Sequence, residues 1–253
     1  MNEVSVARHQ TRRVRHETRR RKLTVVKSEL LTPKMLRLEF TCPDLYDFVS
    51  ASPDDHIKLF FPDSGSAKGV VSRDYTPRAF DTARGMMTID FALHDSGCAT
   101  DWATGAKPGD ILEIGGPRGS AVIADDFDSY LLIGDETALP AIGRRVEEFG
   151  EGQSVTTLVV LDDPKDQQTF KTRAKWTPIW ACRTGVGDDA ALLRRELAGL
   201  HALPGDTFIW IAAEASVAKS LKGYFLDDRR HPAEWIKSAG YWIRGEPGAS
   251  EKM

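Results

Sequence analysis

The chain has 253 residues, of which 41% are hydrophobic and 28% charged, and its formal net charge of −3 excludes a general attraction to nucleic acid or to an anionic membrane. Its length fits one large domain or two small ones, and no apolar stretch approaches the ~20 residues of a membrane span. The widely spaced Cys42, Cys98 and Cys182 form no C-x-x-C pair, which disfavours zinc and iron–sulfur sites and predicts reduced thiols in a cytoplasmic protein.

Residues 1–22 form a strongly basic arm. Eight of them are Lys or Arg, against only Glu3 and Glu17. Like charges repel and apolar side chains are scarce, so the arm is expected to be solvated and partly frayed. The alternative is an electrostatic collar for acidic ligands or nucleic acid. No apolar segment typical of a secretory signal follows the arm.

The pattern from residue 23 to residue 127 predicts short strands interrupted by Pro and Gly, which is typical of a small antiparallel barrel. The expected strands are Leu23–Ser28, Met35–Thr41, His56–Phe61, Met86–Leu93 and Ile111–Ile114.

From residue 128 to residue 253, strands and helices alternate, which indicates an α/β domain with a parallel sheet. The strands are expected at Tyr130–Gly134, Val155–Leu161, Thr177–Cys182 and Thr207–Ala213, and the helices at Leu139–Phe149, Asp188–Leu200 and Ser216–Leu226. We therefore place a domain boundary near residue 127.

The stretch Ser72–Asp81, S-R-D-Y-T-P-R-A-F-D, carries the clearest chemical signal. Arg73 and Arg78 supply two fixed positive charges suited to a pyrophosphate. Tyr75 offers an aromatic face for a planar ring, and Thr76 adds a hydroxyl beside it. The pattern fits a phosphate-bearing cofactor with a flat head, and the alternative is a barrel edge with surface arginines.

A second stretch, Asp90–Trp102, reads D-F-A-L-H-D-S-G-C-A-T-D-W. Gly97 and Ala99 permit close approach of the backbone to a ligand, and a helix starting near Ala99 would offer free N–H groups to a phosphate. His94, taken alone, is equally a hydrogen-bonded histidine at a strand end.

These motifs, R-x-Y-T-x-R, D-F-x-L-H and G-x-A-x-x-W, together resemble the siderophore-interacting proteins, a branch of the ferredoxin–NADP reductase-like flavoenzymes. The later stretches G-D-E-T-A-L-P-A, A-A-E-A-S-V-A-K-S-L-K and G-Y-W-I-R-G match in the same order. The resemblance implies a Greek-key FAD-binding barrel followed by a Rossmann-like domain of the nicotinamide-binding type.

The resemblance also implies site residues. Tyr75 would stack on the isoalloxazine ring, Thr76 would lie near its N5 atom, and Trp242 would lie near the opposite ring face. The full set of expected cofactor-binding residues is Arg73, Asp74, Tyr75, Thr76, Arg78, Asp90, Phe91, His94, Gly97, Ala99, Thr100, Trp102, Asp135, Thr137, Ala138 and Trp242. Lys58, Arg118 and Arg244 are candidate contacts for an anionic substrate, or else solvated surface charges. No residue is assigned as catalytic and none as a metal ligand.

Asp135 and Glu136 lie where a dinucleotide-binding turn usually has glycines. Two carboxylates there would repel a pyrophosphate, which disfavours tightly held NAD but allows transient docking of a nicotinamide. The alternative is simple capping of the helix that follows, and the two roles are compatible.

The function implied by the resemblance is FAD-dependent reduction of a ferric siderophore, with NAD(P)H or ferredoxin as electron donor, by a monomer without nucleic-acid partner. Two alternatives remain open. One is a flavin reductase, or the reductase partner of an oxygenase, with the same fold. The other is a non-catalytic siderophore-binding or iron-responsive protein.

Overall fold

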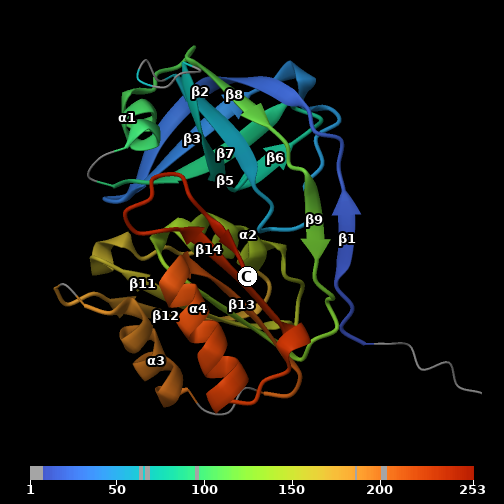
Figure 1. Ribbon diagram of the computed structural model, residues 1–253. Coiled ribbons are helices and arrows are strands. Elements are labelled where there is room, and N and C mark those ends of the chain that lie inside the picture. The colour runs from blue at the N-terminus through green and yellow to red at the C-terminus, as the bar shows by residue number, and fades with distance from the viewer. Residues whose placement is uncertain (1–7, 63–64, 66–68, 95–96, 186, 201–203) are drawn as a thin grey trace, which may run out of the picture.

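The computed structural model describes residues 8–253 apart from 63–64, 66–68, 95–96, 186 and 201–203. Figure 1 shows a curled antiparallel sheet above an α/β layer. Within the described residues, no helix is long and apolar enough to cross a membrane.

The upper part is an antiparallel sheet that curls into a barrel. Its strand order is β5-β4-β8-β2-β3-β7-β6. The two outer strands, β5 and β6, are consecutive in the chain and only residues 76–78 join them, so the sheet must curl to bring its edges together. The strands are β2 (Arg20–Thr32), β3 (Met35–Thr41), β4 (Ile57–Pro62), β5 (Val70–Tyr75), β6 (Ala79–Asp81), β7 (Met86–Ala92) and β8 (Ile111–Gly115).

Every second side chain of the barrel strands points inward and fills the barrel. In β3, Leu36, Leu38 and Phe40 point inward, and the last two are completely buried. The helix α1 (Cys98–Gly105) closes one end, where Ala99 and Ala103 join the same core.

The lower part is a sheet with helices on both faces. Its order is β12-β11-β10-β13-β14-β15, parallel except for the last pair. The strands are β10 (Ser129–Gly134), β11 (Ser154–Leu161), β12 (Lys175–Cys182), β13 (Thr207–Glu214), β14 (Ile236–Trp242) and β15 (Glu251–Lys252). The fold class expected from the sequence is confirmed.

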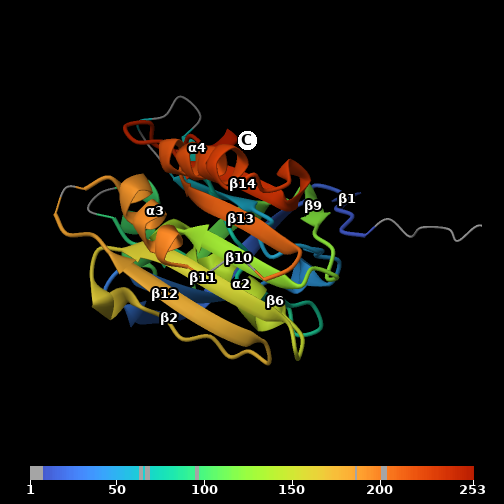
Figure 2. The ribbon, with the colours of Figure 1, turned by 90° about the horizontal axis from the view of Figure 1, so that it is seen from below.

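Both faces of the lower sheet are covered. Tyr130 and Leu132 of β10 pack with α2 (Leu139–Glu148), whereas Leu131 and Ile133 pack with α3 (Asp189–Gly199) and α4 (Ala215–Gly223). Figure 2, seen from below, shows α3 and α4 on the near side of the sheet. α2 lies on the opposite face, toward the barrel, so its side chains can reach both domains.

The basic arm differs from the sequence-based expectation. From Arg12 it is a strand, β1 (Arg12–Arg15), which pairs antiparallel with β9 (Gly119–Val122). His9 docks beyond it: its ring stacks on Phe127 at 4.0 Å. Backbone pairing needs no apolar side chains, so a sequence too charged to fold alone is ordered by a partner strand.

Candidate functional site

The two domains meet at the carboxyl ends of β10 and β11, where open α/β sheets usually bind ligands. An open hollow lies here between the domains. Its lining comes from the β2–β3 turn, the end of β7 and the ends of the parallel strands, as Lys34, Leu93, His94, Glu136, Leu161, Asp162 and Asp166.

Tyr75 ends β5 and packs into the mouth of the barrel. Its ring contacts Phe91 at 4.7 Å between centroids and lies 6.4 Å from Phe61. Burial raises the pKa of the Tyr75 hydroxyl above its usual value, so the ring stays neutral. The next residue, Thr76, is only 7% exposed. Both residues are therefore fixed in position, as a platform for a planar ligand requires.

The two arginines of this stretch have different environments. Arg73 donates to the carbonyl of Ser72 at 2.9 Å and has no ion pair with any residue that the structure describes. Arg78 is buried, with Nη1 2.7 Å from Glu147 and Nε 3.6 Å from Asp90. The uncompensated charge available to a phosphate is thus that of Arg73, while Arg78 chiefly ties the barrel to α2.

Asp90, Phe91 and Ala138, which also belong to the expected cofactor-binding set, are enclosed. Asp90 is held by Arg37 through two 2.7 Å hydrogen bonds. Phe91 and Ala138 are completely buried in the two cores. Burial leaves these side chains little surface to offer a ligand, so they pack beneath the candidate site. Their direct contact with a cofactor remains a prediction.

The α1 end of the barrel is arranged as a turn followed by a helix. Gly97 precedes α1 with φ of 151°, and a Cβ there would meet no atom within 4 Å. The backbone N–H of His94 donates to Thr100 Oγ1 at 3.4 Å, and Trp102 packs 5.9 Å from Phe61. The helix N-terminus therefore opens beside Tyr75, in line with the expected phosphate position.

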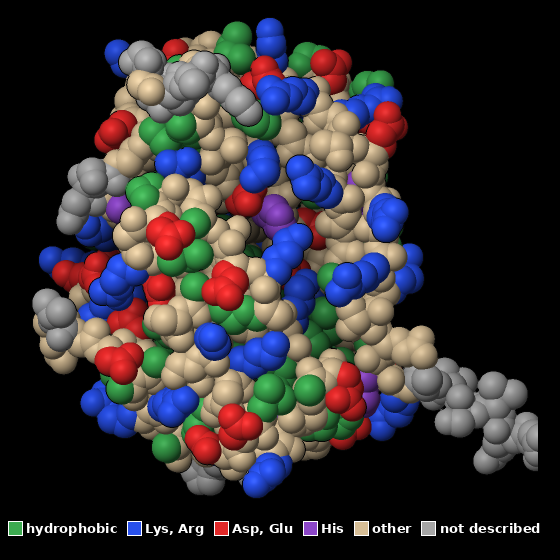
Figure 3. Space-filling model, viewed as in Figure 1, with side chains coloured by type: hydrophobic (Ala, Val, Ile, Leu, Met, Phe, Trp, Pro, Cys, Tyr) green, Lys and Arg blue, Asp and Glu red, His purple; other side chains and the backbone are tan. Residues whose placement is uncertain are grey.

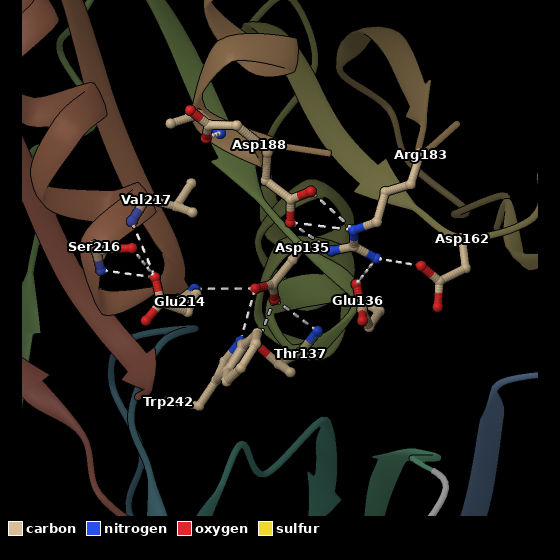
Figure 4. A network of polar contacts seen from close by, with 12 residues as sticks. Asp135, Glu136, Thr137, Asp162, Arg183, Asp188, Glu214, Ser216, Val217 and Trp242 are labelled. Atoms are coloured by element: carbon tan, nitrogen blue, oxygen red, sulfur yellow. Dashed lines mark hydrogen bonds and ion pairs between the residues drawn. The ribbon is translucent and has the colours of Figure 1, made fainter. Parts of the chain in front are cut away.

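Asp135 is the centre of a hydrogen-bond network at the end of β10 (Figure 4). Its carboxylate is 1% exposed and accepts from Trp242 Nε1 at 2.9 Å, from Glu214 N at 3.1 Å and from Thr137 N at 2.9 Å. Asp135 thus caps the turn after β10, as expected. It also fixes the indole of Trp242, so both expected residues lie together.

Glu136 points to a neighbouring cluster in Figure 4. Arg183 Nη1 donates to it at 3.0 Å and to Asp162 at 2.8 Å, while its other nitrogens bind Asp189. Burial, together with the charge of Asp135, raises the pKa of Glu136 to about 7. Three carboxylates around Arg183 make this side of the hollow a poor place for a pyrophosphate.

Arg144 of α2 is a residue that sequence reasoning missed. Its guanidinium is 6% exposed and crosses the domain interface. It donates to the carbonyls of Ser50 at 2.9 Å and Pro77 at 3.2 Å, and to the Ser50 hydroxyl at 2.8 Å. Pro77 lies between Thr76 and Arg78, so Arg144 holds the loop that carries the candidate flavin contacts. A single arginine inside a helix gives no sequence signal for such a role.

The three candidate substrate contacts are not equally free. Lys58 forms an ion pair with Asp74 at 2.8 Å, and in the sheet it lies opposite Gly115, three residues before the exposed Arg118 in the chain. Arg244 belongs to the Asp135 region: its backbone N–H donates to Glu214 at 3.3 Å. Among the described residues, no hydrogen bond joins Arg244 to Lys58 or Arg118.

The segment after β14 nevertheless reaches the barrel. A Cβ on Gly248 would lie 2.6 Å from Arg73 Nη1, so the glycine backbone rests against this guanidinium. The segment then returns as β15 beside β14.

FAD fits these residues. Arg73 carries a positive charge without a carboxylate partner, and Arg78 Nε is a buried donor without a hydrogen bond. The ring of Tyr75 and the N-terminus of α1 are adjacent to them. This donor set suits a flat, phosphate-bearing ligand.

Comparison with known proteins gives two family matches. Residues 127–245 match the siderophore-interacting protein family, and residues 24–72 and 65–121 match its siderophore-interacting FAD-binding domain. A protein of Escherichia coli strain K12 described as an NADPH-dependent ferric-chelate reductase is 33% identical over 249 residues, covering 91% of this chain and 95% of the relative.

Solved structures similar to this chain include proteins of the same kind. A siderophore utilization protein from T. fusca is 32% identical, with a TM-score of 0.87 over 95% of this chain and 98% of that one. The ferredoxin reductase of carbazole 1,9a-dioxygenase, at 17% identity, has a TM-score of 0.67 over 87% of this chain and 66% of that one. The second likeness is one of fold alone.

Proposed function

The chain belongs to the siderophore-interacting protein family, and from this premise we propose that it reduces the iron(III) of a siderophore complex to iron(II), with FAD as its cofactor and NADPH as electron donor. The observation that carries the proposal is the uncompensated Arg73 beside the fixed ring of Tyr75, at the junction with a parallel sheet.

The chemistry that FAD supplies when bound is the conversion of a two-electron hydride donor into single-electron transfers, so one NADPH serves two iron(III) ions. Hard oxygen ligands suit iron(III) better than iron(II), and reduction therefore loosens the metal from the siderophore. No side chain has to move a proton in the step that reduces iron.

The protein's own part is binding and orientation. Arg73 would hold phosphate charge, Tyr75 and Thr76 would position the flat ring, and Trp242, whose indole Asp135 fixes, would contact the same ring. Arg144 keeps the 76–78 loop in place. Lys58, Arg118 and Arg244 are proposed to attract anionic iron complexes, Lys58 less strongly because Asp74 already pairs with it.

The carboxylates at the end of β10 support transient rather than tight docking of the nicotinamide donor. Asp135 and Glu136 are both buried or nearly so and both engaged with other groups, so they cannot turn away from a pyrophosphate. A cytoplasmic location is part of the proposal and is consistent with Cys42, Cys98 and Cys182 being free thiols.

The test is anaerobic. Purified protein is loaded with FAD and its absorbance at the flavin band is followed with NADPH or NADH, then with ferric siderophores, while iron(II) is trapped by a coloured chelator. We expect bleaching by NADPH and rapid recovery with ferric siderophore, together with iron(II). Protein that takes up no FAD would overturn the proposal. Reduced protein that reoxidises equally fast with free flavin or with iron-free siderophore would instead favour a flavin reductase.

A further inference from the structure

The C-terminal tail leaves the lower sheet, touches the barrel and returns. Strand β14 ends at Trp242, and the chain pairs with β14 again as β15, where Gly240 lies opposite Glu251. Between the two strands, residues 243–250 form the red loop beside the barrel in Figure 1. The tail therefore contacts both domains, although it continues a strand of only one.

Both ends of this loop are fixed. At its start, Ile243 and Glu246 form a bridge, and the N–H of Glu246 donates to the carbonyl of Ile243 at 3.0 Å. Beyond its end, Met253 packs against the core of α3 and α4, and the Ser238 hydroxyl donates to its sulfur at 3.6 Å. Gly248, in the middle, is therefore held in place by contacts on either side of it.

Gly248 lies against the guanidinium of Arg73. A Cβ on this glycine would lie 2.6 Å from Nη1, 2.9 Å from Cζ and 3.2 Å from Nε. Three such short distances place the glycine against the face of the flat group, not at the tip of one nitrogen. The φ of Gly248 is 79°, a left-handed conformation that favours glycine. Even a methyl group at this position would push the guanidinium aside.

Few other contacts hold the Arg73 side chain. Its Nη1 donates to the carbonyl of Ser72 at 2.9 Å, and it has no ion pair with any residue that the structure describes. A long side chain without such a pair loses rotamer freedom when it binds a ligand, and this loss lowers the affinity. The contact with Gly248 restricts the guanidinium beforehand and so reduces the loss.

Positive charge is plentiful around this contact. Figure 3 shows Lys and Arg side chains gathered near the junction of the two domains on this face of the molecule. Such charges attract an anion over a distance, but a defined binding position needs a donor with a fixed direction. Arg73, held between Ser72 and Gly248, has a fixed direction.

We propose that Gly248 is a positioning residue for the cofactor. The tail backbone at Gly248 orients the Arg73 guanidinium toward a phosphate of FAD, so a segment of the lower domain completes the phosphate site of the barrel. The inference rests on the proposed function and adds a positioning residue to it. Coupling of this kind acts in both directions, so FAD should in turn hold the tail against Arg73.

The test compares Gly248→Ala with Gly245→Ala in FAD titrations followed by flavin fluorescence. Gly245 lies in the same tail with a φ of 81°, but a Cβ there would meet no atom within 4 Å. Both substitutions strain the backbone in the same way, and only the first displaces Arg73. We expect Gly248→Ala to raise the Kd for FAD about two- to tenfold, the range for ordering one long side chain. Gly245→Ala should keep the wild-type Kd, while the urea midpoint should fall equally in both variants.

A double-mutant cycle separates the orientation of Arg73 from a general effect of the tail. In the Arg73→Ala background, Gly248→Ala should change the Kd for FAD by about twofold at most, because no guanidinium remains to be displaced. An equal loss of affinity in both backgrounds overturns the inference, and so does wild-type affinity in Gly248→Ala. An equal loss in Gly245→Ala also overturns it, since backbone strain alone would then suffice.

Hydrogen exchange of the tail amides tests the coupling without a substitution in the tail. Saturating FAD should slow exchange at residues 248–250 of the wild type about two- to tenfold, and it should not slow exchange in Arg73→Ala. Absence of protection in the wild type overturns the inference, and so does protection that persists in Arg73→Ala, because FAD would then cover the tail directly.

None of these measurements uses NADPH or iron, which separates the inference from the proposed function. If the FAD affinities and the exchange rates change as expected but no ferric siderophore is reduced, the role of Gly248 stands and the reductase proposal fails. If ferric siderophore is reduced and Gly248→Ala binds FAD like the wild type, the reductase proposal stands and the role of Gly248 is wrong.

Discussion

The contact between Arg144 and the 76–78 loop gives the most direct test of how the two domains build the site. In Arg144→Met the apolar stem remains and the guanidinium is lost. The carbonyls of Ser50 and Pro77 then lose their donor in a place where the wild-type side chain is 6% exposed. The hydroxyl of Ser50 keeps a partner, since it donates to Asp55 at 2.9 Å.

The magnitude follows from these contacts. A buried carbonyl left without a donor costs about 1–3 kcal/mol, and the removal of a desolvated charge recovers part of this, so we expect a loss of about 2–5 kcal/mol in the free energy of unfolding. Because Pro77 lies in the loop of the proposed flavin contacts, FAD should also bind roughly tenfold more weakly, or about 1.4 kcal/mol.

Urea unfolding of the FAD-free proteins and FAD titration by fluorescence measure the two quantities. Arg145→Met is the matched control: this neighbouring guanidinium lies 5.4 Å from the ring of Tyr130 and 4.7 Å from that of Phe149, and it makes no hydrogen bond to the described part of the barrel. It should lower stability by about 0.5–2 kcal/mol and leave FAD affinity unchanged. Wild-type FAD affinity in Arg144→Met would refute the reasoning.

Three further predictions concern single side chains. Arg73→Ala should weaken FAD by about 1.5–3 kcal/mol, the range for hydrogen bonds to charged groups, and flavin that survives dilution and gel filtration at wild-type occupancy would exclude Arg73 as a phosphate ligand. Asp135→Asn puts an amide donor against the N–H groups of Trp242, Glu214 or Thr137, which donate to the wild-type carboxylate. Indole fluorescence and the rate of flavin reduction by NADPH should therefore both change, while KM for the siderophore should not. An unaltered fluorescence spectrum would contradict this. Glu136 has a pKa raised from 4.5 to about 7, mainly by burial, so the stability that it contributes is full below pH 4.5 and is lost as the pH rises through 7. Glu136→Gln should flatten that pH dependence of unfolding, and parallel profiles would argue against it.

Much of the fold could be predicted, because hydrophobic periodicity identifies the buried strands. Met35–Thr41 was expected and found with the same bounds, and the buried run at Tyr130–Gly134 extends by only one residue, to Ser129. β5, in contrast, reads V-V-S-R-D-Y, with polar residues on both faces, because its end carries the candidate ligand contacts. A ligand-binding role for these residues, as proposed, would account for the broken strand pattern.

The candidate site could be predicted only where a motif matched. Tyr75 is packed against Phe91, and Asp135 binds Trp242, while their contacts with a flavin stay predictions. The use of Arg78 as a cross-link to Glu147 could not be foreseen, because its partner lies 69 residues away on a helix of the other domain. Charge near a phosphate motif looks the same in sequence whether a ligand or a carboxylate neutralises it.

The position of the basic arm could not be predicted from the sequence either. Composition indicated a frayed segment, yet the ring of His9 is held between Asp126 Oδ1 at 2.8 Å and Asp206 Oδ2 at 2.9 Å. Arg8 also faces Asp206, Asp128 accepts from the Asp206 backbone, and Phe127 and Trp235 pack on the ring. These contacts tie β1 to the lower domain.

Burial opposes protonation of His9, but the hydrogen bonds to Asp206 and Asp126 outweigh it and raise its pKa above 6.5. A histidine with a raised pKa contributes stability that is full below its unfolded value and is lost as the pH rises through the folded value. The difference in urea midpoint between wild type and His9→Gln should therefore be largest near pH 5.5 and shrink toward pH 8.5. Asp206→Asn should remove part of the same dependence. If His9→Gln lowers the midpoint equally at every pH, the ring acts through its stacking on Phe127, and the charged clamp is wrong.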